Sequence, residues 1–241
     1  MKRILSRVRR AVDDYQMIQE GDRIAVGISG GKDSLTLLCA LAELRRFYPN
    51  RFSLCAISLH MGFEDVSFDK VKDLCDRLEV PYLVKMTDIK EVIFDVRKEK
   101  NPCSLCAKMR RGGLNDAAVE MGCNKVALGH HNEDVLETFF LSLFYEGRLN
   151  CFSPITYLSR RDIHVIRPMI YLPEGEIKGF AYRNELPVVK NPCPMDGASK
   201  RQDMKDFIAE KMQEDRFIKT KMMHAIQTGL PDWKLGKDES E

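Results

Sequence analysis

The sequence predicts an α/β protein in which a parallel sheet is covered on both faces by helices. Short apolar runs alternate along the chain with longer segments of helical periodicity. The runs are almost continuously apolar, as expected of parallel strands buried on both faces. A glycine turn separates the first run from the helix after it. Because ligands in such sheets bind beyond the carboxyl ends of the strands, this turn marks the expected site.

The elements are predicted in the following order. A basic amphipathic helix, about Ile4–Ile18, precedes the first strand, Ile24–Ile28, and a helix then begins near Leu35. Four more apolar segments are predicted to be strands: Phe52–Leu59, Tyr82–Val84, Lys125–Gly129 and His164–Arg167. Segments with one apolar face are predicted to be helices: Phe68–Leu78, Ile89–Lys98, Cys106–Met121, Val135–Tyr145, Glu174–Asn184, Ser199–Met212 and Arg216–Thr228.

The same pattern divides the chain into four parts. Residues 1–20 form the basic helix, and residues 21–172 form the α/β domain. Residues 173–230, which include Cys193, form a mostly helical C-terminal extension packed on that domain. Residues 231–241 are expected to be a flexible tail.

The composition limits the class of protein and its partners. With 241 residues and 44% hydrophobic content, the chain can bury one substantial core. The net charge is only +2, so a nucleic acid has to be held by local basic patches. The chain has no run of the ~20 apolar residues that a membrane span requires. Its first residues also lack the apolar core of a secretory signal. We therefore expect a cytoplasmic protein without membrane association.

A phosphate-binding loop is the most specific motif. Ser29-Gly-Gly-Lys-Asp-Ser34 follows the first strand and opens the next helix. Glycines let backbone N–H groups approach an oxyanion, the helix N-terminus attracts negative charge, and Lys32 adds a mobile positive charge. The spacing from Gly27 to Gly31 differs from a Walker A loop, and the dinucleotide fingerprint G-x-G-x-x-G is absent.

Three of the eight cysteines form a second motif. Cys103 and Cys106 have the spacing C-x-x-C, and Asn-Pro precedes both Cys103 and Cys193. The helix after Cys103 and its basic residues favour thiolates. From the spacing alone, three kinds of site remain open: an iron–sulfur cluster, a redox or catalytic thiol pair, and zinc, which takes four ligands. The other cysteines are expected to be small buried hydrophobic residues: Cys39, Cys55, Cys75, Cys123 and Cys151.

A third motif, Leu128-Gly-His-His-Asn-Glu-Asp134, follows the strand that begins at Lys125. That strand delivers the motif to the same sheet edge as the phosphate-binding loop. Asp134 suits Mg²⁺ or the attacking group, and His130 is placed to reach ATP or a proton in transit. The alternative interpretation makes Asp134 a helix N-cap and the histidines solvated loop residues.

Taken together, these motifs resemble the tRNA 2-thiocytidine synthetase (TtcA-type) family of PP-loop ATP pyrophosphatases. The resemblance extends from about Lys2 to His224. It rests on these segments: Glu20-Gly-Asp-Arg-Ile, Ser29-Gly-Gly-Lys-Asp-Ser, Cys103-Ser-Leu-Cys106, Arg110-Arg111-Gly112, Leu128-Gly-His-His, Ile166-Arg167-Pro168 and Pro192-Cys193. It implies a Rossmann-like fold of the adenine nucleotide alpha hydrolase type and a PP-loop domain at residues 21–172.

The resemblance also implies an activity and its cofactors. Family members use ATP, carry a 4Fe–4S cluster on three cysteines, here Cys103, Cys106 and Cys193, and act as homodimers. They replace the C2 oxygen of cytidine 32 in the tRNA anticodon loop by sulfur. The sulfur donor is a cysteine desulfurase or free sulfide. Thiolation of another nucleoside (2-thiouridine), a cluster-free lysidine-type ligase and a nucleotide-responsive iron–sulfur sensor remain alternatives.

Each predicted site residue has a hypothetical role. Lys32 stabilises the leaving pyrophosphate, Asp33 and Asp134 organise Mg²⁺ or the adenylated intermediate, and Arg110 steadies the adenylate. The ATP contacts are expected to be Gly27, Ser29, Gly30, Gly31, Lys32, Asp33, Ser34, His60, Gly129 and His130. The tRNA phosphate contacts are expected to be Arg7, Arg10, Arg111, Arg160 and Arg161.

Overall fold

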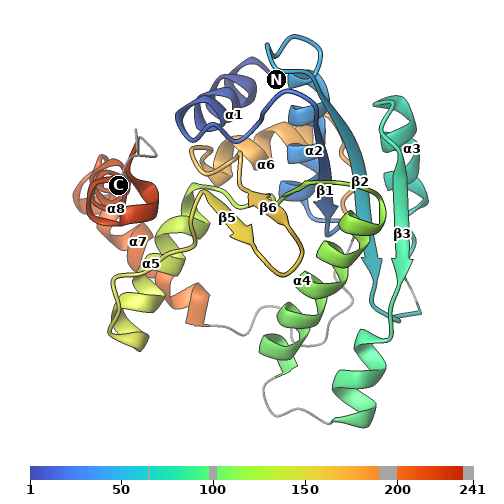
Figure 1. Cartoon of the computed structure of the whole chain (residues 1–241). Helices are drawn as coiled ribbons and strands as arrows, with labels where there is room; N and C mark the ends of the chain where they lie inside the picture. Colours follow the sequence, from blue (N-terminus) through green and yellow to red (C-terminus); the bar gives the residue numbers. More distant parts are fainter. Residues whose placement is uncertain (65, 98–101, 190–199, 236–241) are drawn as a thin grey trace.

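The computed structural model describes residues 1–64, 66–97, 102–189 and 200–235. Within them a six-stranded sheet has the order β3-β2-β1-β4-β6-β5, and every neighbouring pair is parallel except β5 with β6. The strands are β1 (Asp22–Ile28), β2 (Phe52–His60), β3 (Tyr82–Met86), β4 (Lys125–Ala127), β5 (Ile155–Leu158) and β6 (Ile163–Ile166). The predicted α/β fold with a parallel-dominated sheet is confirmed (Figure 1).

Helices cover the sheet and extend beyond it (Figure 1). They are α1 (Lys2–Asp14), α2 (Lys32–Leu44), α3 (Asp69–Arg77), α4 (Pro102–Glu120), α5 (Asn132–Glu146), α6 (Glu174–Arg183), α7 (Lys200–Glu214) and α8 (Ile218–Gly229). A π-helix, η1 (Glu91–Val96), and a 3-10 turn, η2 (Pro231–Trp233), complete the set in the described residues. Helices α1 and α6 pack on α2, whereas α7 and α8 pack on α5.

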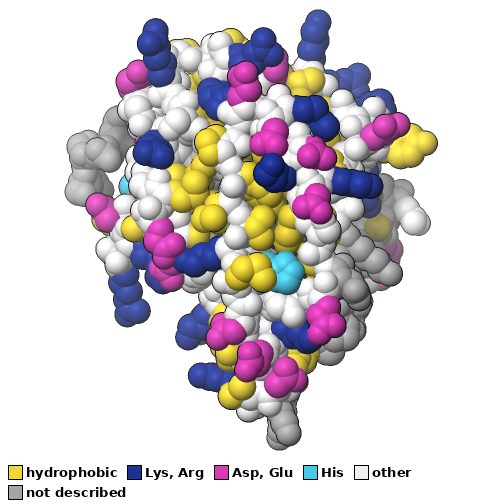
Figure 2. Space-filling model, turned by 90° about the vertical axis from the view of Figure 1, so that its right-hand side faces the viewer, with side chains coloured by type: hydrophobic (Ala, Val, Ile, Leu, Met, Phe, Trp, Pro, Cys, Tyr) yellow, Lys and Arg dark blue, Asp and Glu magenta, His cyan; other side chains and the backbone are white. Residues whose placement is uncertain are grey.

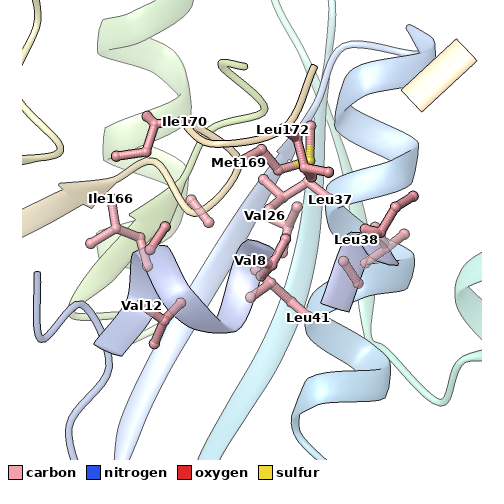
Figure 3. Close-up of a cluster of buried hydrophobic side chains, with 14 of the residues drawn as sticks. Val8, Val12, Val26, Leu37, Leu38, Leu41, Ile166, Met169, Ile170 and Leu172 are labelled. Atoms are coloured by element: carbon pink, nitrogen blue, oxygen red, sulfur yellow. The ribbon is translucent and has the colours of Figure 1, made fainter. Parts of the chain in front are cut away.

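Strand β1 shows how the sequence builds two cores. Its successive side chains point to opposite faces, so Ile24 and Val26 enter the larger core and Ala25 enters the smaller one. The larger core packs α1 and α2 against the sheet, with side chains such as Val8 and Leu37 fully buried (Figure 3). The smaller core lies under α4. The two cores fix where β1 ends and α2 begins, and so they position the phosphate-binding loop.

Several elements differ from the sequence prediction. The basic helix, predicted to reach Ile18, ends at Asp14 as α1. The sequence pattern missed the antiparallel edge strand β5, which is only four residues long and is half-exposed. The helix predicted over 89–98 is the π-helix Glu91–Val96 in the described residues. The helix predicted from Cys106 begins at Pro102, because proline is well suited to a first helical turn, where its missing N–H would have no partner.

The five cysteines outside the predicted cluster site are buried, as expected: Cys39, Cys55, Cys75, Cys123 and Cys151. Burial raises the pKa of Cys39 to about 11 and that of Cys151 to about 12, so both thiols stay protonated. Part of the segment predicted to be a flexible tail forms the 3-10 turn η2, Pro231–Trp233. Trp233 is buried, and its Nε1 donates to the Phe152 carbonyl over 3.2 Å. In the described residues, every helix is too short or too polar to cross a membrane.

Candidate active site

The loop between β1 and α2 is held closed by its own serines. The Ser34 hydroxyl accepts a hydrogen bond from Ser29 N (3.2 Å) and donates one to the Gly31 carbonyl (2.9 Å). Gly30 has φ +82°, a conformation that favours glycine, and a Cβ there would lie 2.8 Å from Val189 Cβ. Val189 N also donates to the Gly30 carbonyl over 2.9 Å. The chain after α6 therefore covers one side of the loop.

Close backbone approach also fixes the neighbouring strand end. A Cβ on Gly129 would lie 3.0 to 3.1 Å from the backbone of Asp33. A Cβ on Gly27 would meet the side chain of Leu114 in α4 at 2.7 Å. These two glycines let the end of β4 pack against the first turn of α2, and α4 pack across β1. Predicted residues from three segments therefore lie at one edge of the sheet.

Lys32 is held by two carboxylates at the start of α2. Its Nζ lies 3.0 Å from Asp33 Oδ2 and 3.1 Å from Glu174 Oε1, at the start of α6. Burial lowers the pKa of Lys32, but the two carboxylates outweigh it and the net pKa is raised. Lys32 is thus a fixed cation beside the loop N–H groups, a suitable arrangement for phosphate oxygens.

His131, rather than His130, lies at the centre of the carboxylates. Its Nε2 lies 3.9 Å from Asp33 Oδ1 and 3.5 Å from Asp134 Oδ2, and its Nδ1 lies 3.3 Å from Glu133 Oε2. Burial opposes its charge, but the three acids raise the pKa of His131. Asp33 Oδ1 is buried and makes no hydrogen bond to the described residues. This carboxylate oxygen is therefore open to a further ligand.

Asp134 is held from two sides. Its Oδ2 accepts a hydrogen bond from His131 N over 2.9 Å, in the first turn of α5, and its Oδ1 accepts one from Arg201 of α7 over 3.0 Å. The alternative interpretation of Asp134 as the helix N-cap is wrong, because His131 is the N-cap of α5 and Asp134, three residues later, completes a capping box with it. Both of its oxygens are thus engaged, in contrast to Asp33.

His130 packs as an aromatic residue. Its ring stacks on the Phe152 ring, with centroids 4.8 Å apart. The guanidinium carbon of Arg167 lies 5.0 Å from the centroid of the same Phe152 ring. Burial lowers the pKa of His130 to about 4. The imidazole is therefore neutral near pH 7, which restricts it to hydrogen bonding and contact. His60 lies at the end of β2, where its Nδ1 accepts from Gly62 N over 3.2 Å.

The cysteine motif lies in the first turn of α4. Cys103 is exposed and Cys106 is partly exposed, and their spacing places both near one helical face. The start of α4 extends beyond the carboxyl ends of β1 and β2, on the side of the sheet where the phosphate-binding loop lies (Figure 1). Arg110 follows one turn later and is exposed. Cys193, the third predicted ligand, lies outside the described residues, within which no group of three metal-ligating side chains occurs.

The arginines predicted to contact tRNA fall into two groups. Three are paired with acids of the same chain: Arg7 with Glu176, Arg10 with Asp14 and Arg161 with Asp116. Arg111 and Arg160 are exposed. On the face formed around α3 and β3, acidic and basic side chains are interspersed (Figure 2).

Comparisons with known proteins agree with this geometry. The family model described as PP-loop domain matches residues 2–212. A tRNA-cytidine(32) 2-sulfurtransferase from Pelobacter propionicus is 40% identical over 233 residues, which cover 95% of this chain and 87% of that protein. Another, from Alkalilimnicola ehrlichii, is 41% identical over 241 residues, covering 98% and 76%. The chain belongs to the tRNA-cytidine(32) 2-sulfurtransferase family of PP-loop proteins. The family predicted from the motifs is confirmed.

A solved structure is also similar to this family member. It is the U34-tRNA thiolase NcsA from Methanococcus maripaludis with its 4Fe–4S cluster. The two superpose with a TM-score of 0.77 at 26% identity, over 94% of this chain and 77% of the other. The likeness extends well beyond the phosphate-binding loop to the α/β architecture as a whole.

Sequence reasoning missed three residues of this PP-loop site. The motif predicts His130 as the functional histidine, and the sequence contains no signal that separates it from its neighbour His131. Glu174 and Arg201 come from helices far along the chain, and their contacts with Lys32 and Asp134 arise only in the folded structure. Glu174 follows Pro173 and begins helix α6, which packs on α2. This acidic helix start was the local indication that Glu174 belongs to the site.

Proposed function

We propose that this protein transfers sulfur to tRNA in an ATP-dependent reaction, replacing the C2 oxygen of cytidine 32 in the anticodon loop. The observation that carries the proposal is the placement of an ATP-type phosphate loop and a C-x-x-C helix start at one edge of the sheet (Figure 1). The names of the relatives, tRNA-cytidine(32) 2-sulfurtransferases, support both the reaction and the nucleoside.

The first chemical step is adenylation. The C2 oxygen of the base attacks the α-phosphorus of ATP, the bond from that phosphorus to the oxygen bridging the β-phosphate breaks, and pyrophosphate leaves. Lys32 and the N–H groups of Ser29–Ser34 stabilise the charge on the pyrophosphate. To release Lys32 for this contact, the phosphates compete with Asp33 and Glu174, which hold its Nζ at 3.0 and 3.1 Å. Arg110 steadies the adenylate. Sulfide then replaces AMP at C2.

The carboxylates of the site fit Mg²⁺. Asp33 Oδ1 is a buried anionic oxygen with no hydrogen bond to the described residues, and Mg²⁺ is usually held by one or two carboxylates together with substrate phosphates. Asp33 is therefore the first candidate ligand, and Asp134, on the other side of His131, is the second. When bound, the ion neutralises charge on the phosphates and aligns them.

The cysteines fit a 4Fe–4S cluster. Thiolates are the usual ligands of such clusters, and the exposed Cys103 and the partly exposed Cys106 lie one turn apart at the start of α4. Cys193 is the proposed third ligand. When bound on three protein thiolates, the cluster supplies an iron with an open position that can carry sulfide. The cluster of the U34-tRNA thiolase supports this assignment.

The tRNA contacts follow from charge and exposure. A base that reacts at C2 has to leave its stack, so the protein must grip the neighbouring phosphates. Arg111, one residue after Arg110 in α4, and Arg160, in the β5–β6 turn, are exposed and suit this role. Arg7, Arg10 and Arg161 can contribute only by exchanging their acidic partners for phosphate.

We extend the proposal to the partners and the compartment. The sulfur donor is free sulfide or a cysteine desulfurase. The exposed Cys103 on α4 makes the cysteine site accessible to either donor. The enzyme acts as a homodimer in the cytoplasm, where thiols stay reduced and tRNA is present. The resemblance to the TtcA-type family supports the homodimer.

A pyrophosphate assay tests the proposed function. The anaerobically reconstituted protein is mixed with ATP, Mg²⁺ and sulfide, with cytidine-32 tRNA, with the same tRNA carrying another base at position 32, or without tRNA. We expect AMP and pyrophosphate to form at least about tenfold faster with the cytidine-32 tRNA than in either control. Equal rates in all three reactions would contradict the proposal and favour a nucleotide-responsive sensor.

A further inference from the structure

An arginine of helix α7, Arg201, contacts the carboxylates of the candidate active site. Arg201, in the first turn of α7, donates from Nη1 to Asp134 Oδ1 over 3.0 Å and from Nη2 to Thr138 Oγ1 over 3.4 Å. Asp134 and Thr138 are one turn apart on α5, so the planar guanidinium fork spans the turn. The other oxygen of Asp134 is fixed by His131 N at 2.9 Å. The carboxylate is thereby held in one orientation from two sides.

A buried acid holds Arg201 in place. The side chain of Glu137 is only 1% exposed, and its two oxygens make no hydrogen bond to the described residues. Arg201 Nη1 lies 3.6 Å from one oxygen, and Lys205 Nζ lies 3.8 Å from the other. A buried carboxylate is costly unless opposite charge compensates it. Glu137 therefore favours the position of Arg201 between α5 and α7.

The contact is not needed to dock α7. The ring of Phe207 packs edge-on against Phe140 and Phe144 of α5, with centroids 5.5 and 5.6 Å apart. Met204 and Ile208 of α7 are also buried. These apolar contacts hold the two helices together without Arg201. The guanidinium of Arg201 can therefore have the separate role of orienting Asp134.

We propose that Arg201 is a positioning residue of the sulfur-transfer reaction, which acts by holding the carboxylate of Asp134 against His131. This inference rests on the proposed function, in which Asp134 organises the ion or the adenylate. Arg201 acts through Asp134. Lys205, one turn further along α7, shares the contact with Glu137 but has no contact with Asp134 among the described residues, so it provides a matched comparison.

The test compares Arg201→Met, Arg201→Lys and Lys205→Met with the wild-type protein, each purified and reconstituted without oxygen. Steady-state AMP formation with tRNA gives kcat and the KM for ATP. Dividing kcat by the iron content gives the activity per chain that carries the cluster. We expect R201M to lower this kcat by about 20-fold, as is typical when the partner of a site ligand is removed. The KM for ATP and the iron content should stay close to wild type. R201K, which keeps the charge but loses the fork, should be intermediate, and K205M should stay within about threefold of wild type.

The outcomes separate the two proposals. If R201M and K205M lose activity equally, or if their losses follow their melting temperatures, then Arg201 only stabilises the fold and the inference is wrong. If R201M does not fold, R201K decides, because full activity of R201K would show that the fork has no role in positioning. If the wild-type protein makes no AMP in response to tRNA, the proposed function itself fails, whatever the variants do.

Discussion

Replacing Asp33 with asparagine should lower tRNA-dependent pyrophosphate release by about 100-fold or more, the effect expected when a group that stabilises transition-state charge is lost. The side chain keeps its size but loses its negative charge. Asp33 Oδ1 is the buried carboxylate oxygen that makes no hydrogen bond to the described residues, and Oδ2 holds Lys32 at 3.0 Å. The substitution therefore removes the proposed Mg²⁺ ligand and also the partner that positions the lysine.

The control for Asp33→Asn lies on the same helix. Glu43, near the end of α2, pairs only with Arg46 among the described residues, and Glu43→Gln should leave the rate within about twofold of wild type. Rates are measured by a coupled pyrophosphate assay over a range of Mg²⁺ concentrations. A D33N protein that is folded and releases pyrophosphate at the normal rate would show that Asp33 has no role in ATP cleavage.

The second large effect is expected at the cysteine motif. Cys106→Ser should reduce the iron of the anaerobically reconstituted protein from about four per chain to below about one, because serine is a poor ligand for iron–sulfur clusters. The broad visible absorption of the cluster should disappear, and thiolation of tRNA should stop. Cys103→Ser and Cys193→Ala should behave in the same way.

A neighbour in the same helical turn gives the control for Cys106→Ser. Ser104 is exposed between the two cysteines, so Ser104→Ala changes the same surface without touching a thiol. It should keep the full iron content and activity. Retained cluster absorption with full thiolation in Cys193→Ala would contradict the three-cysteine site. Iron loss in S104A would point to a general sensitivity of this helix start.

The elements nearest the site were the most predictable from the sequence. The apolar run Ile24–Ile28, the glycine turn and the helix after it are local patterns, and each matches an element of the structure. The sequence pattern missed strand β5, because a four-residue strand at a sheet edge is stabilised by its pairing with β6. The residues of β5 themselves carry no signal of that pairing. The π-helix over Glu91–Val96 has the same apolar spacing as an ordinary helix at this length.

The candidate site was predictable only in part. Lys32 and Asp33 follow from the loop motif itself. The distinction between His130 and His131 depends on which ring faces Phe152 and which faces the carboxylates, and this is decided by the packing around β4 and α5. Glu174 and Arg201 reach the site from α6 and α7, so their roles depend on long-range contacts. The predicted roles of Arg110 and the tRNA-binding arginines remain predictions.

We expect this chain to replace an oxygen of tRNA by sulfur with the consumption of ATP. The most direct test is mass spectrometry of the nucleosides from cytidine-32 tRNA after incubation with anaerobically reconstituted protein, ATP, Mg²⁺ and sulfide. We expect a cytidine heavier by the difference between sulfur and oxygen, formed only when ATP is present and mapped to position 32. Unmodified tRNA, recovered from a reaction in which the iron-loaded protein splits ATP to AMP, would contradict the account.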